Sequence, residues 1–159
     1  MANTYSQIYL QFVFAVKNRE SLIAKEHKEE HKYTTALVQN RNSKMLAIHC
    51  MPNHAHLFVS IKPIVFIPDF IKEIKVESNE FINSKKWMRG KFGWQEGYGV
   101  FSYSHSQIDA VVKYVLNQEA HHQKKTFKQE YHELLKKFEI PFEEKYLFDF
   151  VELGGSYGA

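Results

Sequence analysis

The sequence is poor in cysteine and has no long apolar run. Cys50 is the only cysteine among 159 residues, so no intrachain disulfide can form. This absence predicts a reducing, cytoplasmic setting and a fold that its apolar core stabilises. No stretch reaches the roughly 18 apolar residues that a membrane-spanning helix needs, so we expect no membrane partner. The first residues, MANTYSQIYL, lack the basic leader of a signal peptide and favour a strand.

A large excess of one charge is also missing. The 21 Lys and Arg residues and 18 Asp and Glu residues leave a net charge of +3, which does not by itself indicate a nucleic-acid partner. Positive charge does gather in one basic cluster that also holds an aromatic residue: Lys85, Lys86, Arg89, Lys91 and Trp94. Such a cluster is typical of a solvated surface, and equally of a site that contacts a nucleic-acid backbone and stacks on bases.

Aromatic residues, in contrast, make up 15% of the chain, and the apolar pattern to which they belong indicates the order of elements. The predicted strands cover 5–16, 44–51, 54–61 and part of 91–104, and the predicted helices cover 24–40, 68–82, the segment that follows Ser106, and 126–138. This order, β-α-β-β-α-β followed by helices, is that of the split β-α-β, or ferredoxin-like, α+β fold. We expect one domain over 1–150, with an antiparallel sheet, helices on one face and further C-terminal helices, and a flexible tail over 151–159.

The stretch MPNHAHLFVS places two histidines at the start of an apolar strand. Residues i and i+2 of a strand point to the same face, so His54 and His56 project together, while Ala55 and Leu57 point to the other face. Two imidazoles on one face form part of a metal site that needs three protein ligands. The pattern alone is weak, because about half an H-x-H arises by chance in a chain with nine histidines. Each histidine can instead be an isolated polar residue with its own hydrogen-bond partner.

The segment KYVLNQ places Tyr114 and Gln118 four residues apart on a predicted helix, and therefore on one of its faces. A tyrosine hydroxyl can attack phosphorus, and an amide oxygen can bind a hard cation. The same spacing equally allows Tyr114 to be an aromatic residue at the rim of the core and Gln118 to be a solvated helix residue.

A second histidine pattern points to another chemistry. The segment HKEEH at 27–31 matches the H-x-x-E-H pattern of inverted zinc metallopeptidases, in which two histidines at i and i+4 bind zinc. It lies in a helix rich in Glu and Lys, where this spacing arises easily, so a solvated helix surface is the simpler interpretation. We assign the remaining histidines to structure or solvent: His49, His105, His121, His122 and His132.

Three segments together resemble a known family: MPNHAHLFVS, FGWQEGYGVFSYSHSQIDAVVKYVLNQEAHH and KKTFKQEYHELLKKFEIPFEEKYLFDF. Their order of H-x-H, W-Q-E-G-Y and Y-x-x-x-Q is similar to that of the single-tyrosine transposases of the insertion-sequence 200/605 (IS200-like) type, in the histidine-hydrophobe-histidine (HUH) endonuclease superfamily. The similarity covers nearly the whole chain, to 144–148. Ala55 stands where the family usually has a larger aliphatic residue, so we expect the strand to pack still, with a small void. Asn53 stands where an acidic residue is common, which puts in doubt the hydrogen bonding that supports the first histidine.

The resemblance implies that Tyr114 attacks the scissile phosphate of single-stranded DNA at hairpin-bearing element ends, forming a 5′-phosphotyrosine link and a free 3′-hydroxyl. It implies that His54, His56 and Gln118 bind one divalent ion, Mg²⁺ or Mn²⁺, which stabilises the charge that develops on the phosphate. It also implies a homodimer, in which the tyrosine helix can act in trans on the histidine pair of the other subunit. The basic cluster would then contact the DNA.

Two other functional classes stay open on the residues alone. The first is a non-catalytic protein that binds single-stranded nucleic acid on an RRM-like sheet. No RNP-like run such as K/R-G-F-G-F-V occurs, and this class leaves the H-x-H pair and Gln118 without a joint purpose. The second is a zinc peptidase centred on His27 and His31. A protein–DNA adduct that disappears in Tyr114→Phe or on chelation, and that survives His27→Ala, would separate the classes.

Overall fold

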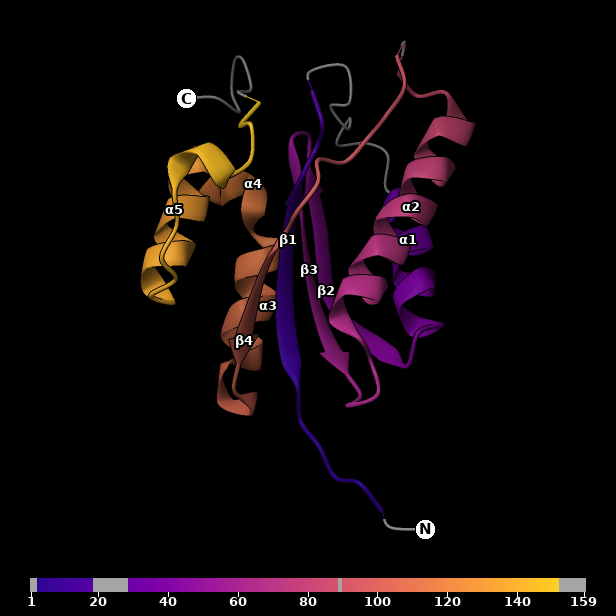
Figure 1. The fold of residues 1–159 in the computed structure, drawn as a ribbon, viewed down its shortest axis with the longest axis vertical. Coiled ribbons are helices and arrows are strands. Elements are labelled where there is room, and N and C mark those ends of the chain that lie inside the picture. Colours follow the sequence, from indigo (N-terminus) through magenta and orange to yellow (C-terminus); the bar gives the residue numbers. More distant parts are fainter. Residues whose placement is uncertain (1–2, 19–28, 89, 152–159) are drawn as a thin grey trace.

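The structure is a computed structural model that describes residues 3–18, 29–88 and 90–151 (Figure 1). The strands are β1 (Tyr9–Ala15), β2 (Ser43–Met51), β3 (His54–Ile61) and β4 (Gly99–Tyr103). The helices are α1 (Glu29–Gln39), α2 (Ile67–Lys85), α3 (Ile108–Leu116), α4 (Gln118–His121) and α5 (Phe127–Lys137), with 3-10 turns η2 (His105–Gln107) and η3 (Glu144–Tyr146). The β-α-β-β-α-β order and the α+β class predicted from the sequence are confirmed.

The strands form one antiparallel sheet in the order β2-β3-β1-β4, which is the ferredoxin-like arrangement. β3 is therefore a central strand, and its residue His56 lies opposite Val13 of β1 and His49 of β2. A slip of one residue would turn every side chain of β3 to the other face of the sheet. Pairing on both sides thus fixes the face to which the H-x-H histidines point.

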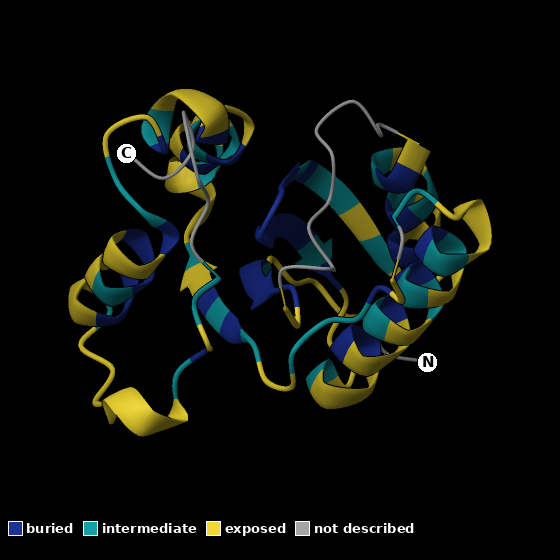
Figure 2. Ribbon diagram, turned by 90° about the horizontal axis from the view of Figure 1, so that it is seen from above, coloured by how far each residue is buried: buried dark blue, intermediate teal, exposed yellow. Residues whose placement is uncertain are grey.

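Helices cover both faces of the sheet (Figure 1). α1 and α2 lie on one face, and the C-terminal helices α3, α4 and α5 lie on the other. Alternate residues of β3 enter the two cores, with Ala55 and Leu57 in the core under α1 and α2 and Phe58 against Val111 and Val115 of α3. Figure 2 shows the buried residues on the strands and on the sides of the helices that face them. Burial on both faces explains why β3 becomes almost entirely apolar after its histidines.

The ends of α2 and α5 follow from local sequence. Pro68 lies in the first turn of α2, where its missing N–H has no helical partner to lose, as predicted. Lys86 ends this helix in the left-handed region, with φ 55°. α5 begins with a capping box in which Thr126 Oγ1 accepts from the Gln129 N–H and the Gln129 side chain bonds back to the Thr126 N–H.

The helix predicted after Ser106 differs from the observed helices at both ends. A capping box formed by Ser104 and Gln107 starts the 3-10 turn η2, so the helical segment begins before Ser106. α3 ends at Leu116, and Asn117, with φ −100° and ψ 23°, separates it from α4. The predicted single helix is therefore two helices with a bend between them.

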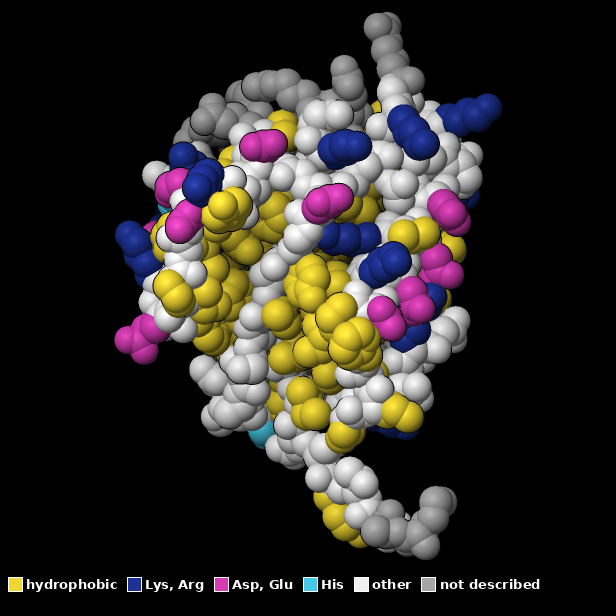
Figure 3. Space-filling model, in the orientation of Figure 1, with side chains coloured by type: hydrophobic (Ala, Val, Ile, Leu, Met, Phe, Trp, Pro, Cys, Tyr) yellow, Lys and Arg dark blue, Asp and Glu magenta, His cyan; other side chains and the backbone are white. Residues whose placement is uncertain are grey.

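β4 is an edge strand, and a loop over 90–98 precedes it. Lys75 of α2 holds this loop, because its Nζ donates to the Gln95 carbonyl over 2.9 Å. Figure 3 shows apolar side chains gathered on either side of the edge strand on this face of the molecule. Within the described ranges, no helix has the length and apolar character needed to cross a membrane. Of the predicted tail only Val151 is described, so the boundary at 150 stays a prediction.

Candidate active site

The H-x-H histidines lie side by side at the start of β3 and face the C-terminal helices. Both side chains are completely buried, and their ring centroids are 5.0 Å apart. Phe127 of α5 stacks on His54 at 3.9 Å, and Tyr114 of α3 lies edge-on to His56 at 5.8 Å. The pleat of the strand therefore projects both rings to one face, as the i, i+2 spacing predicts.

The two helices that follow η2 bring Tyr114 and Gln118 to the same face within a single chain. The Gln118 Oε1 atom lies 3.3 Å from His54 Nε2. The Gln118 Nε2 atom donates to the Tyr114 carbonyl over 3.3 Å. Gln118 is fully buried, so it is not a solvated helix residue. The Tyr114 side chain is half-buried beside the histidine pair. The four residues that the sequence singled out thus converge despite the bend between α3 and α4.

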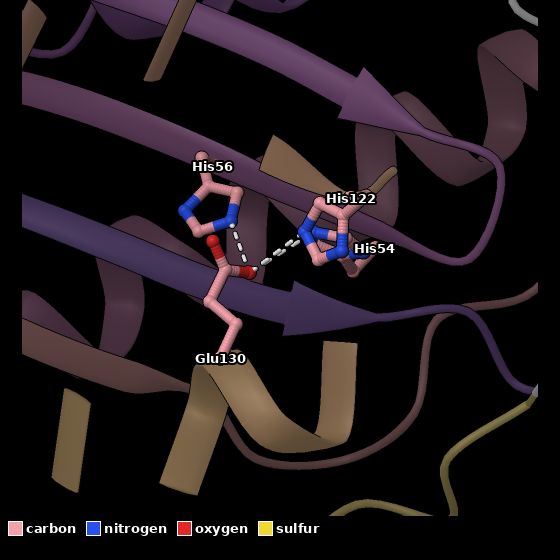
Figure 4. Close-up of side chains that lie close together, drawn as sticks. All are labelled: His54, His56, His122 and Glu130. Carbon is pink, nitrogen blue, oxygen red and sulfur yellow. Dashed lines mark hydrogen bonds and ion pairs between the residues drawn. The ribbon is translucent and has the colours of Figure 1, made fainter. Parts of the chain in front are cut away.

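Glu130 of α5 reaches into the centre of this group (Figure 4). Its Oε1 atom lies 3.1 Å from His56 Nε2, 3.4 Å from His54 Nε2 and 3.1 Å from His122 Nε2. Its side chain is only 2% exposed. One ligand atom from each of these four residues lies within 4.8 Å of the other three. Three imidazole nitrogens therefore surround one buried carboxylate oxygen.

The other oxygen of Glu130 contacts the candidate nucleophile. Its Oε2 accepts from the Tyr114 hydroxyl, and also from Gln118 Nε2 over 3.0 Å. The phenolic hydrogen therefore points at a carboxylate, which fixes the orientation of the Tyr114 hydroxyl group. A single side chain of α5 thus links the histidines to the tyrosine.

Burial and these contacts set the charges in the site. Burial lowers the pKa of His54 to about 3, so its ring is neutral at physiological pH. Burial alone would raise the pKa of Glu130, but its close contacts with the imidazoles, that with His56 first, hold this pKa well below its usual range. Burial, and after it the Glu130 charge, raise the pKa of the Tyr114 phenol. A phenol in this state needs a nearby positive charge to become a nucleophile.

The hydrogen bonds of His54 test whether the residues fit a divalent cation. Its Nδ1 lies 2.7 Å from Asn53 Oδ1, and Asn53 Nδ2 donates to the Val151 carbonyl over 2.9 Å. An amide oxygen only accepts, so the neutral His54 ring carries its proton on Nδ1 and a lone pair on Nε2. Metal-binding histidines have this arrangement, in which the outer nitrogen donates to an oxygen and the inner one is free to bind. The site therefore fits a divalent cation, and Asn53 supports the ring although an acidic residue is more usual there.

Two residues of this site were not predicted. No sequence pattern indicated Glu130, and His122 was expected to serve structure or to face solvent. His122 is buried, and its Nε2 lies 2.9 Å from Gln118 Oε1. One signal was available, because Glu130 lies on the buried side of α5 between Phe127 and Leu134. A carboxylate on an apolar stripe requires a buried polar partner.

The basic cluster lies apart from these side chains. Lys85 and Lys86 are exposed at the C-terminal end of α2, on the opposite face of the sheet from the candidate site (Figure 1). Lys91 is exposed in the loop that follows, and Arg89 lies outside the described residues. The lysines are therefore not placed to contact a phosphate at the histidine pair, and their contact with other parts of a DNA stays a prediction.

Trp94 packs against the core under α2 and is partly buried. Its ring packs edge-on against Phe14 at 4.6 Å and against Phe92 at 4.8 Å. Its Nε1 donates to Ser78 Oγ over 3.0 Å. Neighbouring side chains hold the indole in place, and the base-stacking role of Trp94 stays a prediction.

The H-x-x-E-H segment does not form a solvated surface throughout. Its residue Glu30 is 2% exposed and accepts from Thr34 Oγ1 over 2.7 Å and from Cys50 Sγ over 2.9 Å. The Nε2 of His31 accepts from the Cys50 N–H over 3.0 Å, so this nitrogen is engaged with the backbone. His27 lies outside the described residues. The solvated interpretation is wrong for Glu30, which is part of the packing between α1 and β2.

Comparisons with known proteins found several that are similar to this chain. The family model described as "Transposase IS200 like" matches residues 4–118. The ISDra2 transposase TnpA of Deinococcus radiodurans is 25% identical over 118 residues, which are 70% of this chain and 84% of that protein. A solved transposase candidate from Deinococcus radiodurans has a TM-score of 0.58 and 21% identity, and the match covers 74% of this chain and 95% of that one.

A second solved structure, a REP-associated tyrosine transposase bound to a REP hairpin, has a TM-score of 0.57 and 13% identity. The match covers 100% of this chain and 96% of that one. At these identities the two solved structures show a common fold. The family match extends from the residues before β1 to Gln118 and so includes the histidine pair and the candidate nucleophile.

Proposed function

Since this chain belongs to the family of IS200-like transposases, we propose that it cleaves and rejoins single-stranded DNA through a 5′-phosphotyrosine intermediate. The substrates are the hairpin-bearing ends of a mobile element, by extension from a neighbour whose structure contains a REP hairpin. The observation that carries the proposal is the convergence of Tyr114 and Gln118 with His54 and His56 in one buried site. We assign the reaction to the cytoplasm, where a reduced Cys50 is compatible with the surroundings.

The proposal gives the nucleophilic role to Tyr114. Its Oη forms a bond to the phosphorus while the bond from phosphorus to the 3′ oxygen breaks. The phenol releases its proton, the leaving 3′ oxygen gains one, and the phosphate at the 5′ end of the downstream strand stays on the tyrosine. A 3′-hydroxyl can reverse these steps on a new strand, and the covalent link makes an external energy source unnecessary.

His54, His56 and Gln118 are the proposed ligands of one divalent ion, Mg²⁺ or Mn²⁺. When bound, the ion supplies positive charge that stabilises the phosphate oxygens in the transition state and makes the phenol a better nucleophile. The Nδ1–H of His54 donates to Asn53, which directs the Nε2 lone pair into the site. Gln118 and the histidine pair approach from opposite sides, so the ligands are held by both the sheet and the helices.

The main competing function fits the fold less well. A non-catalytic RRM-like protein binds single strands on an open face of its sheet, where aromatic residues stack on the bases. Here α1 and α2 cover one face, and α3, α4 and α5 cover the other (Figure 1). The polar residues on β3 are buried under helices and cannot stack on a base without a rearrangement.

An adduct assay tests the proposal. We expect hairpin-bearing single-stranded DNA with Mg²⁺ or Mn²⁺ to yield a protein–DNA adduct on a denaturing gel. Tyr114→Phe removes the attacking oxygen and keeps the ring, so the adduct should disappear, as it should on chelation. Tyr146→Phe is the matched control, because Tyr146 is 76% exposed and far from the histidines in sequence. An adduct that persists in Tyr114→Phe would exclude this nucleophile.

The proposed homodimer has its own test. We expect a mass of two chains by light scattering. A mixture of Tyr114→Phe and His54→Ala chains should regain activity only if the tyrosine helix of one subunit serves the histidine pair of the other. In the structure the two residue sets lie together in one chain, which is the arrangement for action in cis. A mixture that remains inactive, from an active wild-type dimer, would exclude action in trans.

A further inference from the structure

We propose that His122 and Glu130 are direct ligands of the divalent ion, so that the C-terminal helices supply an imidazole and a carboxylate in addition to Gln118. This inference rests on the metal site of the proposed function. It concerns two residues that lie beyond the family match, which ends at Gln118. It follows from the directions of the hydrogen bonds around the four side chains in Figure 4.

The tautomer of His122 is fixed in the same way as that of His54. The Nδ1 atom of His122 lies 2.8 Å from the carbonyl oxygen of Lys125. A carbonyl oxygen only accepts a hydrogen bond, so this nitrogen carries the proton. In the neutral ring the Nε2 atom of His122 therefore has a lone pair. His54 and His122 both turn lone pairs towards the same oxygen of Glu130.

Each of these lone pairs faces oxygen atoms that are themselves hydrogen-bond acceptors, and no hydrogen lies between the two. His122 Nε2 lies 2.9 Å from Gln118 Oε1 and 3.1 Å from Glu130 Oε1. His54 Nε2 lies 3.3 Å from Gln118 Oε1 and 3.4 Å from Glu130 Oε1. The amide nitrogen of Gln118 is engaged elsewhere, with Glu130 Oε2 and a backbone carbonyl, so the amide cannot simply turn over. Four electron-pair donors thus converge in a buried space, an arrangement that a cation stabilises.

His56 joins this set after one exchange of hydrogen bonds. Its Nδ1 lies 2.9 Å from Gln11 Nε2, which only donates, so its Nε2 carries the proton and donates to Glu130. Gln11 Oε1 accepts from the Tyr103 hydroxyl over 2.8 Å. If the Gln11 amide turns over, its oxygen accepts from Nδ1 and its nitrogen donates to the Tyr103 oxygen. The His56 Nε2 lone pair then points to the same centre, and Gln11 acts as a positioning residue for it.

The donor types predict which ions bind. Three imidazoles, one carboxylate and one amide oxygen make a set rich in nitrogen. Imidazole nitrogen suits transition metals, whereas Mg²⁺ prefers oxygen ligands in near-octahedral geometry and retains several waters. We therefore expect Mn²⁺ and Zn²⁺ to bind this site more tightly than Mg²⁺. A site of only two histidines and Gln118 would leave more coordination positions to water and would discriminate less.

Calorimetric titration of the metal-free full chain with Mn²⁺ tests the proposal without measuring activity. We expect one bound ion in the wild type and a loss of affinity of at least about tenfold in Glu130→Gln and in His122→Gln. The matched controls are Glu133→Gln and His132→Gln, both on α5. Glu133 pairs with Lys125, and His132 pairs with Glu144. These controls should bind like the wild type. Unfolding in EDTA shows whether each variant retains its fold.

A measurement on the wild type covers the case in which a variant does not fold. Addition of diamagnetic Zn²⁺ to chain labelled with ¹⁵N-histidine should shift the ring nitrogens of His122 together with those of His54 and His56. Before Zn²⁺ is added, His54 and His122 should give the spectrum of the neutral ring with its proton on Nδ1. Ring nitrogens of His122 that do not shift when Zn²⁺ is added would overturn the proposal.

The outcomes separate this inference from the proposed function. If His54→Ala abolishes Mn²⁺ binding while Glu130→Gln and His122→Gln bind like the wild type, the ion uses only the three ligands of the proposed function and the inference fails. If the wild type binds no Mn²⁺, or if His54→Ala binds it unchanged, the metal assignment of the proposed function fails as well. Loss of affinity in His54→Ala, Glu130→Gln and His122→Gln supports both.

Discussion

The replacement of Glu30 by Gln should stabilise the protein at neutral pH, because Glu30 is a buried carboxyl group outside the candidate active site. It lies in the first turn of α1 and accepts from Thr34 over 2.7 Å and from Cys50 over 2.9 Å. Burial raises the pKa of Glu30, and these two hydrogen bonds only partly oppose that change. Burial also raises the pKa of the Cys50 thiol well above its usual range, so this neighbour stays uncharged.

The direction of the pH dependence follows from linkage. A carboxyl group whose pKa is raised on folding binds its proton more tightly in the folded state. Its contribution to stability is complete below the unfolded pKa, near 4.5, and is lost as the pH rises through the folded pKa. Each unit of that rise is worth about 1.4 kcal/mol. The amide introduced by Glu30→Gln cannot ionise and still accepts from Thr34, so the variant should gain about 1 kcal/mol or more at pH 7.5, and little at pH 4.

Urea unfolding of the wild type and Glu30→Gln from pH 4 to 8, followed by tryptophan fluorescence, measures this difference. The variant should gain stability relative to the wild type as the pH rises, which moves its urea midpoint to a higher concentration. Glu29→Gln is the control on the adjacent, exposed residue, whose ion pair with Lys85 should be worth no more than about 1 kcal/mol. A difference between wild type and Glu30→Gln that does not change with pH would refute the reasoning.

Three further changes have defined outcomes. Gln11→Leu removes the hydrogen-bond partner of His56 Nδ1, so the Mn²⁺ affinity measured by calorimetry should fall about 10–100-fold. An unchanged affinity would show that the contact between Gln11 and His56 is dispensable. Gly99→Ala places a Cβ 2.6 Å from the Tyr131 hydroxyl oxygen, so α5 must move away from β4. The free energy of unfolding in urea should therefore fall by about 1–3 kcal/mol, and an unchanged value would show that α5 moves without cost. Arg41→Ala breaks the ion pairs that join the end of α1 to two glutamates of α2. The free energy of unfolding should fall by about 1 kcal/mol in low salt and by less in 1 M salt. A loss that does not depend on salt would indicate that Arg41 acts through packing.

The sequence was sufficient to predict those parts of the site that depend on regular geometry. The strand period of two places His54 and His56 on one face, and the helical spacing places Tyr114 and Gln118 together. The hairpin of β2 and β3 follows from two apolar runs separated by Pro52-Asn53. These features depend on residues close in sequence, so a local pattern determines them.

Contacts between distant segments were not accessible in the same way. Glu130 reaches the histidines only because the turn after α4 returns the chain so that α5 packs over the start of β3. The sequence shows a carboxylate on the apolar stripe of α5, and Glu30 gives the same signal on α1. This signal indicates a buried partner but does not identify it. For Trp94, the neighbouring lysines favoured an exposed ring, but packing against Phe14 and Phe92 leaves it only partly exposed.

The position of β3 between two other strands divides the proposed catalytic centre into parts of unequal local stability. His54 and His56 lie on a strand that is paired on both sides, whose amides we expect to exchange with solvent more slowly than those of unpaired segments. Glu130 lies on α5 and His122 in the turn after α4, and strand pairing restrains neither of them. The four side chains around the shared carboxylate oxygen therefore come from two layers, and we expect faster amide exchange at Glu130 than at His56.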